Sequence, residues 1–266
     1  MNHSAIEINN LSFSYNGEDV LKNINLKIDC GEHVAIIGHT GIGKTTLLYQ
    51  ISALLMPNAG TVKILGYDSA EEKEEIRKKV GLVFQEPDHQ LFCMTVEEDV
   101  AFGPRNMCLS ETEVKKRVDY ALKVTGLEKQ KSKPPHQLSG GQKKLACIAG
   151  ILAMDPQILI LDEPTTGLDP EQTREVMDFI YKKLTKEKKT MILVTHDVEL
   201  IPKYTRRVIL LHHGKIVKDG NPREIFNEPA LLKKCGLAVP KTVELFNKLG
   251  KKDIALTVDE AVEKLR

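Results

Sequence analysis

A glycine-rich segment between an apolar run and a helical pattern constrains this chain more than any other feature. Residues 38–45 read GHTGIGKT, which fits the pattern G-x-x-x-x-G-K-[ST]. Residues 33–37 before it form a short, largely apolar run typical of a strand buried on both faces, and residues 46–55 after it favour a helix. This order predicts a phosphate-binding loop, because glycines let backbone N–H groups turn toward an anion at a helix N-terminus.

The residue types within the loop suit a triphosphate and its metal ion. Lys44 is placed to neutralise the outer phosphates, and the Thr45 hydroxyl is a ligand for Mg²⁺. The alternative is a glycine-rich turn with an incidental lysine, which the flanking strand and helix disfavour. The other residues predicted to contact the nucleotide are Gly38, His39, Thr40, Gly41, Ile42, Gly43 and Thr46.

Three further apolar runs, at 81–84, 158–161 and 191–194, predict additional strands with helical segments between them. This alternation indicates an α/β domain with a mostly parallel sheet. Ligands of such sheets bind beyond the carboxyl ends of the strands. The polar residues at these ends are Gln85, Asp162, Glu163, Thr195 and His196, and we expect them to reach a nucleotide held by the loop.

Each of these polar side chains has a chemical role and a plainer alternative. Asp162 after its apolar strand fits the Walker B pattern, in which it holds Mg²⁺ through water, and Glu163 is placed to accept a proton from the attacking water. Turn formation before Pro164 is the alternative for this pair. Gln85 is predicted to orient water and contact Mg²⁺, and His196 to contact the γ-phosphate, although strand-end amides and histidines are often only satisfied polar groups.

A second helix N-terminus also has the features of an anion site. Ser139 and Gln142 form a capping box before a helix that runs through Leu152, and Gly140 and Gly141 leave backbone N–H groups accessible. Two such helix ends predict a site closed from both sides, with simple helix capping as the alternative.

The rest of the chain gives local signals. Alternating apolar residues over 5–28 predict antiparallel strands at the start. Capping boxes are expected at Ser110 and Thr257, each three residues before a glutamate, and Asp169 before a proline is expected to cap another helix. After about residue 219, short helices are separated by prolines and glycines, and the last one has an apolar stripe that must cover something.

Composition excludes several classes of function. Lys and Arg number 38 and Asp and Glu 37, so the formal net charge is +1 and nucleic acid is not an expected partner. The apolar run at 145–154 is shorter than the ~18 residues that a membrane span needs. The start of the chain shows no secretory signal, and five cysteines without close pairing are expected to stay reduced in the cytosol.

These motifs, in this order, resemble the ATP-binding subunits of ABC transporters over about residues 5–225. The resemblance implies a P-loop ABC cassette that forms a head-to-tail dimer with a second copy or a paralogue. ATP and Mg²⁺ on the loop of one subunit are then clamped by residues 139–142 of the other. By the same resemblance Tyr15 stacks on adenine, Gln85 is the Q-loop glutamine, Glu163 the general base, Asp169 the D-loop acid and His196 the switch histidine.

A narrower resemblance rests on residues 85–92, residues 95–104 and the helical tail, which are similar to energy-coupling-factor ATPases. It implies ATP-driven import of a cobalt or nickel ion or a vitamin, with the chain peripheral on the cytoplasmic face of the membrane. An integral-membrane coupling subunit would dock near residues 86–104, within a helical signature subdomain at about 86–155, and a substrate-binding membrane subunit would be served indirectly. The tail at 226–266 would help join the two ATPases.

Three positions depart from the family pattern, and one rival reading stays open. Thr40 and Ile42 stand where cassettes usually have Asn and a small residue, and Leu145 stands where arginine is frequent. The alternative function is a soluble cassette ATPase of DNA repair or chromosome maintenance, but Lys44 and Leu138 lie too close in sequence for the long coiled coil of those proteins. A GTP switch lacks its base-reading motif here, and a non-catalytic nucleotide-binding partner is disfavoured by Glu163.

Overall fold

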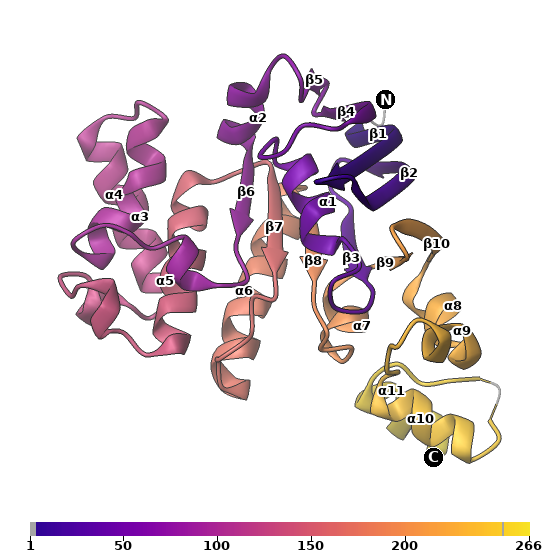
Figure 1. Cartoon of the computed structure of the whole chain (residues 1–266). Helices are drawn as coiled ribbons and strands as arrows, with labels where there is room; N and C mark the ends of the chain where they lie inside the picture. Colours follow the sequence, from indigo (N-terminus) through magenta and orange to yellow (C-terminus); the bar gives the residue numbers. More distant parts are fainter. Residues whose placement is uncertain (1–3, 252) are drawn as a thin grey trace. The chain divides into compact units, whose positions relative to one another are not determined.

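The computed structural model describes residues 4–251 and 253–266, which form two compact units (Figure 1). The first unit combines the residues up to Glu71 with Ile192–Arg266, and the second is Glu72–Met191. Within the described residues, no helix combines the length and the apolar character that crossing a membrane requires.

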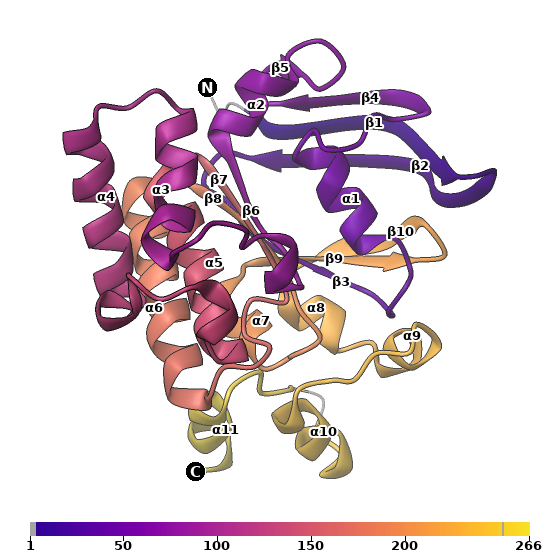
Figure 2. The same cartoon turned by 60° about the vertical axis from the view of Figure 1, so that its left-hand side comes forward.

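An antiparallel sheet begins the first unit, as the alternating apolar residues predict. β1 (Ser4–Tyr15) and β2 (Glu18–Asp29) form a hairpin, and β4 (Ala59–Ile64) and β5 (Tyr67–Asp68) extend the sheet in the order β2-β1-β4-β5 (Figure 2). Asn16 and Gly17 make the hairpin turn and both have positive φ, which matches the twist of the two strands.

A second group of strands in the first unit carries the predicted phosphate loop. β3 (His33–Ile37) is buried along its length and pairs in parallel with β9 (Arg207–His212), which pairs antiparallel with β10 (Lys215–Gly220). On the other side of β3 lies β8 (Thr190–Val194), which enters this unit at Ile192. Helix α1 (Lys44–Ile51) follows the loop, and α7 (Leu200–Tyr204) joins β8 to β9.

Four helices complete the first unit. They are α8 (Pro222–Phe226), α9 (Pro229–Lys234), α10 (Lys241–Lys248) and α11 (Val258–Leu265). Buried side chains from α8, α9 and α10 and from the strands β3 and β9 form one cluster, so much of the tail packs on the same core as the phosphate-loop strand. The cluster includes Ala35, Ile37, Val208, Leu210, Ile225, Phe226, Leu232 and Val243.

The second unit contains two of the predicted parallel strands. β6 (Val80–Val83) and β7 (Ile158–Asp162) pair in parallel and are buried at every residue, which is why both appear as continuous apolar runs. α2 (Lys73–Lys79) precedes β6, and α6 (Pro170–Glu187) follows β7. All four predicted strands are therefore present within one residue of the predicted limits.

Three helices of the second unit pack on one another (Figure 1). They are α3 (Val96–Asn106), α4 (Glu111–Val124) and α5 (Gly140–Met154), with short 3-10 turns at Pro87–His89, Glu128–Gln130 and Pro135–Gln137. Apolar residues on the facing sides, such as Val100, Val118 and Ile148, are almost completely buried. The helices between β6 and β7 therefore form a compact bundle.

The helix predicted over 46–55 is shorter than expected. It ends at Ile51, and Ala53 adopts the left-handed region at φ 52°. The N–H groups of Leu54 and Leu55 both donate to the Tyr49 carbonyl, which closes the last turn. No glycine or proline marks this end in the sequence, so the local pattern gives no sign of it.

Two of the predicted capping boxes are half formed. Ser110 and Thr257 each accept a hydrogen bond from the N–H group of the glutamate three residues later. The two glutamate side chains do not return the bond in the described structure: Glu113 pairs with Arg117 at 2.9 Å, and Glu260 accepts from the N–H of Leu256 at 2.8 Å. Neighbours four residues away, Arg117 and Leu256, therefore compete successfully with the local cap.

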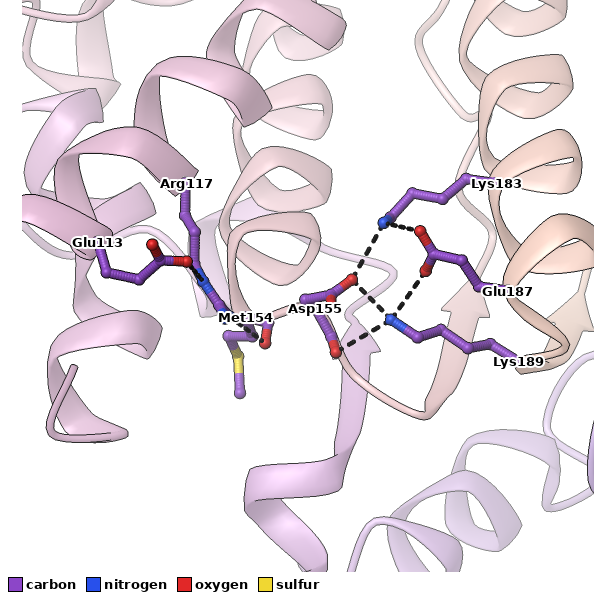
Figure 3. Close-up of polar contacts among 7 residues, drawn as sticks. All are labelled: Glu113, Arg117, Met154, Asp155, Lys183, Glu187 and Lys189. Atoms are coloured by element: carbon purple, nitrogen blue, oxygen red, sulfur yellow. Dashed lines mark hydrogen bonds and ion pairs between the residues drawn. The ribbon is translucent and has the colours of Figure 1, made fainter.

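An ion-pair network fixes the C-terminal end of α5 within the second unit (Figure 3). Asp155 has φ 57°, and its Oδ1 accepts from Lys189 Nζ at 2.6 Å and from Lys183 Nζ at 3.1 Å. Glu187 pairs with both lysines, and Arg117 of α4 donates to the Met154 carbonyl at 3.2 Å. The network joins α4 and α5 to α6.

We expect Asp155→Asn to lower the free energy of unfolding at neutral pH by about 1 kcal/mol, because asparagine keeps the left-handed backbone and loses the charge. Burial raises the pKa of Asp155, but hydrogen bonds from Lys189 and Lys183 outweigh it, so the pKa lies below its ordinary value. The contribution is therefore complete above the unfolded-state pKa of ~3.9 and is lost as the pH falls through the folded-state pKa. Urea unfolding at several pH values measures it, and a difference between wild type and variant that grows on acidification would contradict it.

Candidate functional site

The phosphate loop lies where the sequence predicts, directly after β3. Gly41 and Gly43 have φ values of 79° and 102°, which L side chains adopt only with strain. A Cβ at Gly38 would lie 2.6 Å from the Leu211 carbonyl oxygen, so the close approach of β9 requires glycine there. The loop backbone is thus held in its turn by the strand beside it.

The end of this loop fits an anion. Gly43 is the N-cap of α1 and has no side chain to cap the helix, and the first turn contains Lys44, Thr45 and Thr46 and no acidic residue. Lys44 Nζ donates to the carbonyls of Gly38 at 2.8 Å and His39 at 3.0 Å, which holds the ammonium over the loop. Backbone N–H groups, the helix dipole and this cation together make a site suited to phosphate.

Two other predicted contacts belong to the same unit. His196 is exposed two residues after the end of β8, and the preceding Thr195 hydroxyl accepts from the N–H of Asp197 at 3.0 Å. Tyr15 is 44% exposed at the end of β1, and its ring contacts that of Phe13 edge-on at 4.8 Å between centroids. Both side chains are accessible to a ligand.

In the second unit, β7 ends at the predicted acidic pair. Asp162 and Glu163 are 3% and 7% exposed. Glu163 has φ 47°, a conformation that costs a residue with a side chain of its size about 1 kcal/mol or more. Strained backbone at a buried carboxylate is a common mark of a functional position.

The residues at 139–142 form the predicted capping box, and the predicted D-loop lies against them. Ser139 Oγ accepts from the N–H of Gln142 at 3.2 Å, and Gln142 Oε1 accepts from the N–H of Ser139 at 3.1 Å. A Cβ at Gly141 would lie 2.7 Å from the Gly167 carbonyl oxygen, whereas one at Gly140 would meet nothing within 4 Å. Gly140 is therefore open to an approaching ligand.

Asp169 has a structural role that the sequence also predicts. It is the N-cap of α6, and its Oδ1 accepts from the N–H of Gln172 at 2.8 Å. Its side chain is exposed two residues beyond Gly167, which touches the start of α5. The structure thus brings the predicted signature and D-loop segments together within one unit.

Gln85 is held by a residue that the sequence did not single out. Its side chain is exposed, but its carbonyl accepts from Lys144 Nζ at 2.6 Å. Burial lowers the pKa of Lys144, and the nearby thiol of Cys147 and carboxylates of Asp162, Glu86 and Glu163 oppose this. The only sign of this contact in the sequence is that Lys144 stands next to the apolar run of a helix, and the sequence does not indicate which groups it binds.

The departures from the family pattern leave the described backbone of the site intact. Thr40 is exposed and Ile42 is half-buried in the loop. Leu145 is 4% exposed and belongs to the buried face of α5. An apolar residue is therefore well placed at position 145. The first unit retains its phosphate-binding features, and the second unit retains the two carboxylates and the second helix N-terminus.

A protein-family model and known relatives match this chain. The ABC transporter family matches residues 21–166. The energy-coupling factor transporter ATP-binding protein EcfA of Methanocaldococcus jannaschii is 47% identical over 252 residues, which are 93% of this chain and 90% of that protein.

Two solved structures are similar to this chain in fold. CbiO1 of Clostridium perfringens, part of the ABC transporter complex cbiONQ, superposes with a TM-score of 0.75 at 40% identity and covers 92% of this chain and 99% of that one. A dimeric ATP-binding cassette in a post-hydrolysis state with ADP and Pi superposes with a TM-score of 0.75 at 32% identity, over 82% of this chain and 99% of that one.

Proposed function

Since this chain belongs to the ABC transporter ATP-binding proteins, and among them to the ATPases of energy-coupling factor transporters, we propose that its ATP hydrolysis powers import of a micronutrient, a cobalt or nickel ion or a vitamin. The observation that carries this proposal is the likeness to EcfA over 93% of the chain. A DNA-repair ATPase is not supported by any of these relatives.

We assign the binding of ATP to the loop residues and their neighbours. Lys44 and the backbone N–H groups of residues 38–46 hold the phosphates, and Tyr15 stacks on the adenine. Thr45, Gln85 and Asp162 would hold Mg²⁺, since all three offer the oxygen ligands that this ion prefers. Bound there, Mg²⁺ neutralises charge on the phosphates.

Hydrolysis depends on two further residues. Glu163 accepts the proton of the attacking water. His196 donates to the γ-phosphate and orients it. The buried position and left-handed backbone of Glu163 support this assignment, because they restrict where its carboxylate can lie.

A second ATPase subunit, identical or paralogous, would complete each site. Residues 139–142 of one subunit close over the ATP of the other, and Asp169 lies at the same junction. The open space at Gly140 supports this role, because a bound phosphate could reach the helix N-terminus there. The tail helices offer a further contact between subunits through exposed apolar side chains at Leu249, Val258, Val262 and Leu265.

The surface for the membrane partner is assigned to residues 86–104. Phe92 and Met94 are 65% and 79% exposed, and the rings of Phe92 and Phe102 meet edge-on at 4.8 Å. Phe92 and Phe102 line a mostly apolar groove of about 210 Å³, and Met154 lines it as well. Exposed aromatic residues around a groove suit an apolar helix of an integral-membrane coupling subunit, which would keep this chain at the cytoplasmic face.

Phe92→Glu tests this function. We expect the variant to fold and to lose recovery of the membrane subunits by at least ~10-fold when the tagged chain is purified from detergent-solubilised membranes, because a charge cannot enter the apolar contact. Val217→Glu, which changes a 43% exposed residue of β10, is the matched control. Recovery of the same membrane proteins with both variants would contradict the docking surface, and recovery of none with wild type would contradict the transport function.

A further inference from the structure

Lys144 is a buried cation without a carboxylate hydrogen-bond partner among the described contacts. Its side chain is 1% exposed on α5, five residues after the N-cap Ser139. Nζ donates to the carbonyls of Phe84 at 3.0 Å and Gln85 at 2.6 Å. A lysine is costly to bury, so two well-placed acceptors are needed to hold it there.

Two more hydrogen bonds join the same segments. Gln90 Oε1 accepts from the N–H of Phe84 at 3.1 Å, and Gln90 Nε2 donates to the Cys147 carbonyl at 2.9 Å. The backbone after β6 is therefore attached to α5 at successive points. Lys143 pairs with Asp88 at 2.7 Å, but Asp88 is 74% exposed, so solvent weakens this pair.

These contacts tie Gln85 to the helix that begins at the signature residues. Ser139 and Lys144 belong to one continuous helical segment, which moves as a unit on the scale of a turn or two. The carbonyl of Gln85 is fixed to that segment, whereas its side chain is exposed. A shift of α5 therefore displaces the backbone from which the Gln85 side chain extends.

We propose that Lys144 is a positioning residue that couples the two ATP sites of the dimer, by transmitting the position of the signature helix to Gln85. The proposal rests on the proposed function, in which residues 139–142 contact the ATP of the partner and Gln85 serves the ATP of its own subunit. Closure of one site on α5 then sets the position of Gln85 in the other. The coupling is a free-energy linkage between sites, so it changes the cooperativity of turnover.

The test compares Lys144→Met with Lys143→Met in the purified dimer or complex. Lys144→Met keeps a long apolar side chain and removes the donor, and we expect kcat to fall by ~10- to 100-fold because Gln85 is misplaced. The affinity of the single subunit for ATP should stay within about twofold, and the Hill coefficient for ATP should fall toward 1. Lys143→Met should leave kcat within about twofold, because its pair is exposed.

Lys144→Arg is the rescue variant, because it retains the positive charge and its N–H donors. Recovery of most of the kcat in this variant supports the role of Lys144. Thermal unfolding shows whether each variant is folded. If Lys144→Met does not fold, Lys144→Gln carries the test, because its shorter amide side chain lacks the positive charge and the reach of the lysine. Wild-type kcat and cooperativity in folded Lys144→Met, or in Lys144→Gln where that variant replaces it, overturn the inference, whereas a wild-type protein that hydrolyses no ATP overturns the proposed function instead.

Discussion

Glu163→Gln is expected to bind ATP as tightly as wild type and to hydrolyse it ~10²- to 10⁴-fold more slowly, the usual contribution of a general base. Glutamine has nearly the same shape but cannot take a proton from water. Because Glu163 is 7% exposed and held at φ 47°, water has little freedom to replace the missing carboxylate. The defect should therefore appear in kcat and not in nucleotide affinity.

The measurement is steady-state phosphate release together with nucleotide binding on the same preparation. Glu171→Gln is the matched control, because Glu171 is exposed in the first turn of α6, eight positions further along the chain. Its turnover should stay near that of wild type. Near-normal turnover in Glu163→Gln would remove this residue from the role of base and direct attention to His196.

Sequence predicts the strands and caps of this protein well because their causes are local. β3, β6, β7 and β8 are buried at every residue, so a continuous apolar run is required at each of them. The phosphate loop needs positive φ at Gly41 and Gly43, and only glycine supplies it cheaply. Where folding depends on a few neighbouring residues, their identity is sufficient.

Contacts between distant segments explain what the sequence did not show. The Lys144 ammonium reaches carbonyls some 60 positions earlier in the chain, and the pattern of α5 gives no sign of them. Competition within one helix explains a second difference, because Glu113 pairs with Arg117 four residues later and leaves half of the expected cap unmade. The box at Thr95 and Glu98 is complete and is not among the predicted ones.

The roles of the site residues also depend partly on local sequence and partly on contacts between distant segments. Residue type and spacing predict that Lys44 serves phosphate and Glu163 serves water. The structure adds hydrogen-bond partners for Lys44, and burial and backbone conformation for Glu163. The meeting of these two side chains around one nucleotide stays a prediction, and so does the closure of the site by residues 139–142 of a second subunit. An experiment that separates the contributions of two copies is therefore the most informative one.

Ser139→Arg is expected to abolish turnover, with a loss of at least ~10²-fold, while the single subunit still binds ATP. Ser139 is exposed at the N-terminus of α5, where arginine removes the cap and fills the space meant for the phosphate of the partner's ATP. The phosphate loop of the same copy is unchanged. Ser132→Arg, at an exposed serine outside the helix N-terminus, should retain turnover.

Mixing Ser139→Arg with Lys44→Ala tests whether each site is shared between copies. Neither variant turns over alone, since every site in the first lacks a working signature and every site in the second lacks the phosphate-binding lysine. In a mixed dimer, the loop of the Ser139→Arg copy faces the signature of the Lys44→Ala copy, so one site contains both intact elements.

Turnover should return to at most about half of the wild-type rate if the sites act independently, and to less if they are coupled. Mixed dimers that form, shown by tagged purification, and yet stay inactive would mean that two intact sites are required or that each copy completes its own site. A titration of wild type with Ser139→Arg distinguishes these cases, because independent sites lose activity linearly and coupled sites lose it more steeply.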